Sequence, residues 1–338
     1  MRAVMKILFI LLGVGIIFVM ISVIFLPDWD LFANTFGNDA DYGDLITYTE
    51  DEVVTDLKLE LENRHIEINY VDEEVLTIEY YKQENDTFDF NVVDGMLTMT
   101  HDFDSFWLNI FSFNIASRTV ITVHVNIPES WILDTLDLKT MTGDIDMTFD
   151  NTKTYDEVKL FNHTGDMHIE NINVLRLNAH TSTGDINMSD IQASESFIAE
   201  VSTGDMTLNR IDTDTFDIQS STGDIVFSSI TATDGDVNVS TGGVTISSST
   251  FDHLTVDVST GKINLNNIIS NSYLLESSTG DISVTVSSLD DLRFDLETDT
   301  GKIKINGVSQ GDEYQSFTGT IDFIASTNTG NITIEVDA

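Results

Sequence analysis

The feature that most constrains this sequence is a Thr-Gly pair that recurs from residue 142 onward. It is usually followed by Asp and then an aliphatic residue, as in STGDINM and STGDIVF. Successive pairs lie mostly 19 or 20 residues apart, and such self-similarity identifies a repeat architecture. The repeated glycines are Gly143, Gly165, Gly184, Gly204, Gly223, Gly242, Gly261, Gly280, Gly301, Gly319 and Gly330.

Apolar residues keep a fixed distance from these glycines. The second residue after each glycine is apolar: Ile145, Met167, Ile186, Met206, Ile225, Val244, Ile263, Ile282, Ile303, Ile321 and Ile332. So is the fourth: Met147, Ile169, Met188, Leu208, Phe227, Ile246, Leu265, Val284, Ile305, Phe323 and Ile334. A period of two places both residues on one face of a strand, so we predict that a strand leaves every glycine.

Each unit carries further apolar positions. Many units add an isoleucine seven residues after the glycine, such as Ile172 and Ile191, and an apolar pair before the next glycine, such as Phe216 with Ile218. A unit this short fits neither a propeller blade nor a paired-helix repeat. The sequence therefore predicts an all-β fold, a β-solenoid resembling a parallel β-helix with rungs of about 19–20 residues, over residues 141–338. Glycine at a fixed place predicts a corner with positive φ or a close backbone approach.

The N-terminus has the pattern of a membrane anchor. Residues 7–26 are uncharged and apolar, and at about 1.5 Å per residue they span a hydrocarbon core of roughly 30 Å. The run ends at Pro27 without the small-residue exit of a cleaved signal peptide. Arg2 and Lys6 precede it, which favours a cytoplasmic N-terminus. We expect residues 1–27 to be a single transmembrane anchor in the lipid bilayer, 28–44 a tether, and the rest extracellular.

Residues 45–140 alternate like strands but lack the repeat. They include LKLELEN, HIEINYV and TVITVHVNIP, and we expect irregular leading rungs or a capping sheet. A cap is required because the first rung would otherwise expose unpaired backbone groups. The apolar segment FWLNIFSF (106–113) is expected to be a buried cap strand, with a membrane-facing or partner-facing patch as the alternative.

Charge and cysteine content exclude several classes of function. The chain has 57 acidic and 15 basic residues, a formal charge of −42, which repels nucleic acid. It has no cysteine, so disulfides and cysteine-based metal sites are excluded.

The best ligand candidate is the column of Asp144, Asp166, Asp185, Asp205 and Asp224, which stacked corners bring together. Carboxylates about 4.8 Å apart repel, and Ca²⁺ would relieve the repulsion. The favoured interpretation is that these side chains accept N–H bonds within turns and stay hydrated. Farther along, Lys262, Asp281 and Lys302 indicate alternating charges without a metal.

No catalytic chemistry stands out in the sequence. His163, His168 and His180 lie in neighbouring units, but solvated surface histidines are the favoured interpretation. No GxSxG, HExxH, phosphate-loop or dinucleotide motif occurs. We predict no catalytic residue, no cofactor-binding or metal-binding residue, and no cofactor.

From about Val53 to Glu335 the sequence resembles the putative adhesin family of Gram-positive cell-envelope proteins typified by LiaG and YvlB. The resemblance lies in the alternation around His65, the VHVNIPES segment and the array of TGDI turns. It implies a non-enzymatic role in the envelope, linked to adhesion or envelope stress, and supplies no catalytic residues. The sequence departs from the usual Asp at Gly243, Lys262, Lys302, Thr320 and Asn331.

These observations favour a membrane-anchored extracytoplasmic β-solenoid that displays an acidic surface and binds an envelope glycan or a surface protein. The alternatives are a glycan-active β-helix enzyme, either lyase or hydrolase, and a membrane-bound accessory of a stress-response system. The partner and the oligomeric state stay open.

Overall fold

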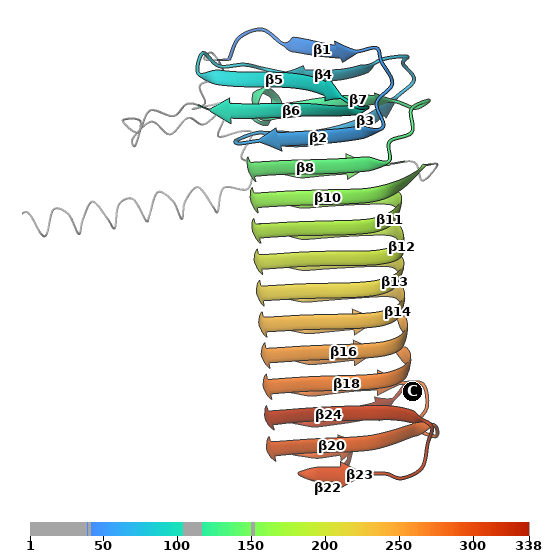
Figure 1. Ribbon diagram of the computed structural model, residues 1–338. Coiled ribbons are helices and arrows are strands. Elements are labelled where there is room, and N and C mark those ends of the chain that lie inside the picture. Colours follow the sequence, from blue (N-terminus) through green and yellow to red (C-terminus); the bar gives the residue numbers. More distant parts are fainter. Residues whose placement is uncertain (1–38, 40–41, 104–116, 150–152, 338) are drawn as a thin grey trace, which may run out of the picture.

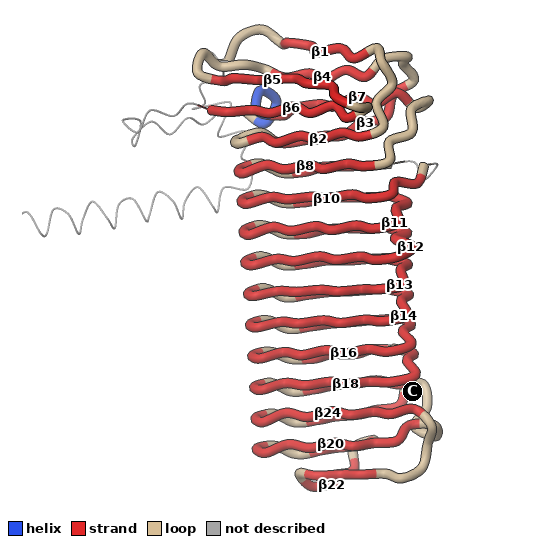
Figure 2. Tube along the Cα trace, in the orientation of Figure 1, coloured by secondary structure: helices blue, strands red, loops and turns tan. Residues whose placement is uncertain are grey.

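The chain folds into a straight rod of stacked strands with a cap at each end (Figure 1). The computed structural model describes residues 39, 42–103, 117–149 and 153–337. All 25 strands in these ranges join one sheet, and the one α-helix in these ranges is the single turn α3 (Arg118–Ile121). Figure 2 shows how completely strands make up the rod. The prediction of an all-β solenoid is confirmed for this part of the chain.

Several predictions fall outside the described residues. They concern the membrane anchor at 7–26, most of the tether at 28–44 and the FWLNIFSF segment at 106–113. Within the described ranges, no helix combines the length and the apolar character that crossing a membrane requires. The anchor and its orientation stay predictions from the sequence.

The strands fall into three groups along the chain. The first group is β1 (Ile46–Glu50), β2 (Asp56–Leu61), β3 (His65–Val71), β4 (Leu76–Tyr80), β5 (Asp86–Val93), β6 (Met96–Phe103) and β7 (Thr122–Pro128). The second is β8 (Thr135–Thr142), β9 (Ile145–Thr148), β10 (Thr154–Thr164), β11 (Met167–Thr183), β12 (Ile186–Thr203), β13 (Met206–Thr222), β14 (Ile225–Thr241), β15 (Val244–Ser247), β16 (Thr250–Thr260), β17 (Ile263–Asn266), β18 (Ile269–Thr279) and β19 (Ile282–Val286). The third is β20 (Leu292–Thr300), β21 (Ile303–Ile305), β22 (Val308–Gly311), β23 (Glu313–Gln315), β24 (Ile321–Thr329) and β25 (Ile332–Val336).

Each regular rung consists of a short segment, a sharp corner and a long segment. After Gly184, β12 begins at Ile186, turns at Asp190 with φ of 58° and ends at Thr203. Left-handed residues stand at the same place in neighbouring rungs: Asn171, Arg210, Ser229, Ser248 and Asn267. Asn and Asp tolerate this conformation well. The sequence did not predict this second corner, because its residues share no single type.

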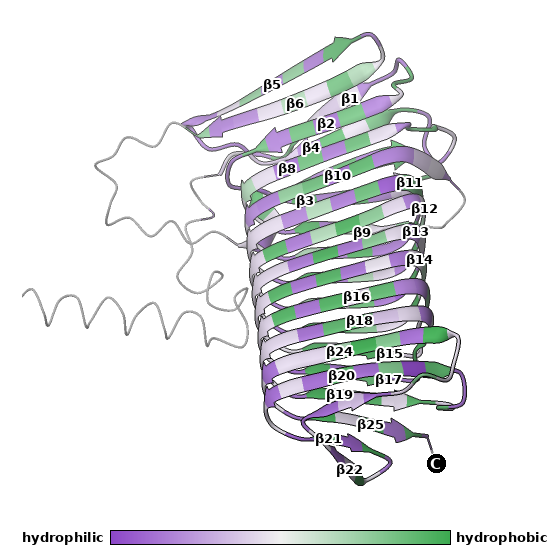
Figure 3. Ribbon diagram, turned by 60° about the horizontal axis from the view of Figure 1, so that its bottom comes forward, coloured by the Kyte–Doolittle hydropathy of each residue, from purple (hydrophilic) through white to green (hydrophobic). Residues whose placement is uncertain are grey.

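Neighbouring rungs pair in parallel and in register, as the stacking of the repeats predicts. Met167 faces Ile186, which faces Met206, which faces Ile225. The second residue after each stacked glycine is at most 1% exposed, and the fourth residues and the isoleucines at the seventh position are buried too. Along the strands, Figure 3 shows hydrophobic and hydrophilic positions alternating. The predicted dry interior is therefore confirmed.

Aromatic rings fill the middle of this interior. Phe197 and Phe216 stack with centroids 5.6 Å apart, and Phe227 meets Phe216 edge-on at 5.1 Å. Gly235 occupies the place of Phe216 in the next rung, where a Cβ would lie 2.7 Å from Cδ1 of Phe251. The Phe251 ring thus fills the volume that the missing side chain leaves, which keeps the core close-packed.

At the N-terminal end, the first rung of the chain lies inside the stack. β2 pairs in parallel with both β6 and β8, and β3 pairs in parallel with both β7 and β9. The rung of β2 and β3 therefore separates two rungs that follow it in sequence. Both of its edges are paired.

The C-terminal end repeats this arrangement and corrects the predicted sequential order. β24 pairs in parallel with β18 and β20, and β25 with β19 and β21. The glycine column accordingly runs from Gly280 to Gly330 and then back to Gly301. Gly319 lies outside the column, against the backbone of Asp291 and Leu292, so its prediction as a rung corner is wrong. β24 and β25 form a rung inserted between the rung of β18 and β19 and that of β20 and β21, called the inserted rung below. Ile321 and Phe323 belong to its long strand, β24.

Antiparallel strands cover the outermost rungs. At one end β5 pairs with β6, β4 with β7 and β1 with β4. At the other end β23 pairs with β20 and β22 with β21. Covering strands of the opposite direction interrupt the parallel edge, which protects the rod from end-to-end association of rungs.

Candidate functional site

A column of glycines forms one corner of the rod. Gly204, Gly223 and Gly242 have φ of 146°, 145° and 144°. A Cβ on Gly223 would lie 1.8 Å from the carbonyl oxygen of Gly204, and one on Gly242 would lie 1.9 Å from that of Gly223. Both reasons predicted for glycine, the positive φ and the close backbone approach, therefore apply together.

The predicted aspartate column lies beside these glycines and forms an axial ladder of hydrogen bonds. The backbone N–H of Asp185 donates to Oδ1 of Asp166 at 2.8 Å, and those of Asp205 and Asp224 donate in the same way to the preceding aspartate at 2.8 Å. Asp166 likewise donates to Asp144 at 2.9 Å. The carboxylates therefore hold one rung to the next. They accept corner N–H groups as expected, with the donor supplied by the following rung.

The ladder is interrupted where the sequence departs from Asp. Gly243 donates to Asp224 at 2.7 Å but has no side-chain oxygen to offer the next rung. Lys262 follows it, and its Nζ lies 3.7 Å from Oδ2 of Asp281. The corner therefore lacks the carboxylate acceptor for two successive rungs.

Beyond this interruption the ladder resumes in the inserted rung. Asn331 donates its backbone N–H to Oδ1 of Asp281 at 2.9 Å, and its own Oδ1 accepts the N–H of Lys302 at 3.1 Å. Lys262 and Asp281 pair as the predicted charge alternation implies, and the neutral Asn331 separates Asp281 from Lys302. Thr320 takes no part, because Gly319 is not a corner of the column.

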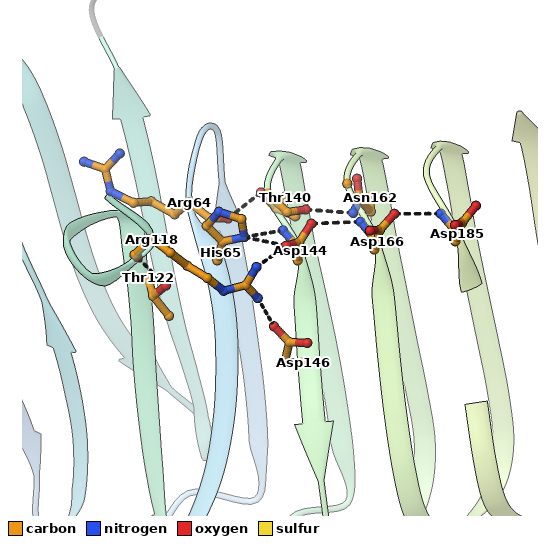
Figure 4. A network of polar contacts seen from close by, with 12 residues as sticks. Arg64, His65, Arg118, Thr122, Thr140, Asp144, Asp146, Asn162, Asp166 and Asp185 are labelled. Atoms are coloured by element: carbon orange, nitrogen blue, oxygen red, sulfur yellow. Dashed lines mark hydrogen bonds and ion pairs between the residues drawn. The ribbon is translucent and has the colours of Figure 1, made fainter. Parts of the chain in front are cut away.

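The first member of the ladder is a histidine that the sequence analysis missed (Figure 4). Asp144 donates its backbone N–H to Nδ1 of His65 at 2.8 Å. Arg64 stands where later rungs have glycine, since a Cβ on Gly143 would lie 2.2 Å from its carbonyl oxygen. The sequence RHIEI could have revealed this rung. Its apolar residues Ile66 and Ile68 lie two and four positions after Arg64, the same spacing that the apolar residues of each repeat have from its glycine.

Arg118 neutralises the carboxylates at this end of the ladder (Figure 4). Its Nη1 donates to Oδ2 of Asp144 at 2.5 Å, and its Nη2 forms an ion pair with Asp146. Thr122 holds the helix that carries it, by donating its hydroxyl to the Arg118 carbonyl at 2.7 Å. Although burial opposes the charge, the two carboxylates raise the pKa of Arg118.

The carboxyl groups of this cluster differ in acidity. Burial raises the pKa of Asp144, but the His65 ring, the Asp166 N–H and the Arg118 guanidinium outweigh burial and hold that pKa well below its usual range. Burial and the charge of Asp144 raise the pKa of Asp166 and, despite Arg118, that of Asp146. Asp144 is therefore the most strongly stabilised anion of the cluster.

The three predicted surface histidines do not converge. His163 contacts the Ser182 hydroxyl at 3.1 Å. His168 lies 3.3 Å from Glu170, and His180 lies 3.1 Å from Glu200. Across the described ranges, no three His, Cys, Asp or Glu side chains are grouped so that they could hold a metal ion.

A shallow groove crosses the long strands in the middle of the rod. We call it the polar groove, and Glu200, Gln219, Asn238 and Asp257 line it. These four residues face one another in register on consecutive rungs. Amide and carboxylate groups thus repeat at about the rung spacing of 4.8 Å, a row of hydrogen-bond donors and acceptors open to solvent.

The column of outward-facing side chains that lines the polar groove continues toward the N-terminal end of the rod, where its residues are aromatic or cationic. Glu200 lies in register with His180, and His180 with Phe161. The Phe161 and His180 rings stack with centroids 5.2 Å apart, and Nζ of Lys139 lies 5.6 Å from the Phe161 centroid. The polar groove is therefore continuous with an aromatic and cationic stretch of surface.

A buried charge cluster in the N-terminal cap also escaped the sequence analysis. Arg64 and Asp86 form an ion pair away from solvent, and Nε2 of His101 lies 3.2 Å from Oδ1 of Asp86. Burial raises the pKa of Asp86, yet His101, the N–H of Gln83 and Arg64 together lower it below its ordinary value. The cluster ties β5, β6 and the start of β3 together, so its role is structural.

A family model described as Toastrack DUF4097 matches the chain twice, over residues 54–202 and 193–336. The two matches together cover the stacked rungs from β2 to β25. No curated protein sequence matches the chain.

Several solved structures match the chain at low sequence identity and low TM-score. A putative adhesin from Parabacteroides distasonis has 11% identity and a TM-score of 0.37, covering 87% of this chain and 98% of its own. A putative adhesin from Bacteroides fragilis has 12% identity and a TM-score of 0.33, covering 88% and 99%. A putative lipid binding protein from Parabacteroides distasonis has 14% identity and a TM-score of 0.28, covering 88% and 98%.

Proposed function

Because the chain belongs to the Toastrack DUF4097 family, we propose that its rod is an adhesin-like display and binding module of the cell envelope. The module presents the polar groove and the surface continuous with it to an envelope glycan or a surface protein. Residues 7–26 hold it in the membrane with the N-terminus in the cytoplasm and the rod outside the cell.

The observation that supports this proposal most is the rigid row of polar side chains in the polar groove. Its members are fixed on paired strands, so little conformational entropy is lost when a partner docks. Amides such as Gln219 and Asn238 both donate and accept, which suits the hydroxyls of a sugar chain or the backbone of an extended peptide.

The glycan-active alternative has less support from the geometry. The groove carboxylates Glu200 and Asp257 lie three rungs apart, about 14 Å at a rung spacing of 4.8 Å. Paired carboxyl groups of glycosidases lie roughly 5–9.5 Å apart. We therefore propose a module that binds without catalysis.

A binding assay with isolated envelope material tests the proposal. In the double variant Gln219→Ala/Asn238→Ala two hydrogen bonds are lost, each worth about 0.5–1.5 kcal/mol, so affinity should fall roughly 5- to 150-fold. The matched control is Asn187→Ala/Thr207→Ala, which removes polar side chains from the short segments of β12 and β13 on another face of the rod. Equal retention of both variants and the parent chain would contradict the assignment of the groove.

Two cell experiments address the anchor and the association with envelope stress. Protease added to intact cells should digest the rod and spare the N-terminus. A chain that keeps residues 1–44 but lacks the rod should localise to the membrane and lose partner binding. If that truncated chain still supported the stress response, the anchor region and not the rod would carry that role.

A further inference from the structure

The C-terminal end of the rod contains a unit that one rung interface and one connection join to the rest. We call residues 292–336 the terminal module; it comprises β20 to β25. Its three layers pair with one another, because β20 lies between β24 and β23, and β21 lies between β25 and β22. Its aromatic rings pack together, with Phe294 5.4 Å from Phe323 and 6.2 Å from Tyr314, and Phe323 also lies 4.9 Å from Tyr273 of β18 across the boundary.

One interface joins the terminal module to the rest of the rod. The N–H of Gly280 donates to the Thr329 carbonyl at 2.9 Å, and the N–H of Ile282 to the Asn331 carbonyl at 2.9 Å. The corner ladder crosses the same boundary from Asp281 to Asn331. These contacts are of the kind that joins regular rungs, so β18 and β19 offer an edge that any copy of β24 and β25 fits.

The connection between the rod and the module bypasses the inserted rung. Residues 287–291 leave β19 and reach β20, while β24 and β25 occupy the position between them. Everywhere in the regular stack the chain passes directly from one rung to the next. At this boundary, as at the junction of β2 and β3 with β8 and β9, a whole set of layers can separate from the stack by breaking one rung interface and moving one connection.

From this topology we propose that the terminal module exchanges between two copies of the chain, so that β24 and β25 of one copy pair with β18 and β19 of the other. The exchanged pair keeps the rung-to-rung contacts of the single chain and changes the path and the local contacts of residues 287–291, where Leu289 packs against the core. Moving the module as a unit breaks one rung interface, whereas withdrawing β24 and β25 alone breaks two.

Exchange joins two rods at the ends opposite their N-terminal caps (Figure 1). The formal charge of −42 on each copy opposes their approach, so exchange should increase with ionic strength. The inference stands apart from the proposed function, because it involves no groove residue.

Disulfide trapping tests the exchange. The chain has no cysteine, and Thr279 and Thr329 are exposed in-register partners across the interface, at a spacing that a disulfide accepts. Full-length Thr279→Cys chains are mixed with mass-tagged Thr329→Cys chains, unfolded and refolded together in high salt, and oxidised. A disulfide-linked heterodimer is expected on a non-reducing gel.

Two mixtures serve as matched controls. Thr241→Cys with Thr260→Cys places the pair across a regular rung boundary, and Thr300→Cys with Thr329→Cys places it inside the module. Neither mixture should give the heterodimer. A single chain with both Thr279→Cys and Thr329→Cys should close an internal disulfide, which shows that the substitutions leave the interface intact.

If the internal disulfide forms while the Thr279→Cys and Thr329→Cys mixture gives no more heterodimer than the Thr241→Cys and Thr260→Cys control, the proposal is wrong. Equal heterodimer in the Thr300→Cys and Thr329→Cys mixture would also overturn it, because β24 and β25 would then move without the rest of the module.

Discussion

Replacing Gly223 by alanine tests the physical basis of the stack. The new Cβ would lie 1.8 Å from the carbonyl oxygen of Gly204, on a residue with φ of 145°. Holding an L-residue in that conformation costs about 1–3 kcal/mol. Relieving the clash separates two rungs and weakens the bonds from Gly204 to Thr222 and from Gly223 to Thr241, now 3.0 Å each. Their loss adds about 1–3 kcal/mol, so we expect a destabilisation of roughly 2–6 kcal/mol.

Gly243→Ala is the matched control for this substitution. It lies at the same corner without a positive φ, and its Cβ would meet Asp224 and Lys262 at ordinary contact distances of 3.5 and 3.7 Å. We expect a change within about 1 kcal/mol. Chemical denaturation followed by circular dichroism measures both variants against the parent. Equal stability of the two variants would refute the close-approach argument.

Five further predictions concern the ladder and the cap. Millimolar calcium should leave the melting temperature unchanged, because the ladder carboxylates already accept backbone N–H groups; a clear rise would restore the metal-site hypothesis. Asp144→Asn should lower the melting temperature at pH 7, because the depressed folded pKa means that the Asp144 carboxylate stabilises the folded parent. The difference between parent and variant should shrink as pH falls below about 3.9, because protonation removes that stabilisation from the parent. Asp166→Asn should raise the melting temperature at pH 7, because the raised folded pKa means that the ionised Asp166 destabilises the folded parent. The gain should shrink as pH falls toward about 4, where Asp166 becomes protonated in the parent. An equal dependence of the melting temperature on pH for the two variants would contradict the assigned pKa shifts. Gly243→Asn should stabilise the rod by about 1 kcal/mol by supplying the missing ladder acceptor, and an unchanged unfolding midpoint would count against the ladder. Asp86→Ala should destabilise the cap by about 3–5 kcal/mol, because Arg64 stays buried without its partner; a loss below 1 kcal/mol would show that water reaches Arg64.

The regular part of the fold could be predicted from the sequence because each rung repeats the same residue pattern. Glycine marks the corner, and the residues two and four positions later face inward in every stacked rung. The order of rungs at the two ends could not be predicted in this way. Every rung presents the same edge chemistry, so the pattern that identifies Gly301 and Gly330 as corners contains no information about which one follows Gly280.

The candidate site was predictable only in part. The aspartates were identified from their spacing, but their donor comes from the next rung, and the ladder is visible only once the register is known. His65 and Arg118 were missed because the first rung replaces Gly-Asp by Arg-His and the cation comes from a different segment. The polar groove was foreseen only as part of a general acidic binding surface.

Distances between spin labels on the exposed corner threonines test the central claim most directly. With one label at Thr164 and the second at Thr241, Thr260, Thr279, Thr329 or Thr300, in-register stacking predicts separations that rise from about 19 Å in steps of about 4.8 Å, in that order. The inserted rung places Thr329 nearer to Thr164 than Thr300 is. Separations that do not increase in this order, or a shorter distance to Thr300 than to Thr329, would contradict the stacked and interlocked rod.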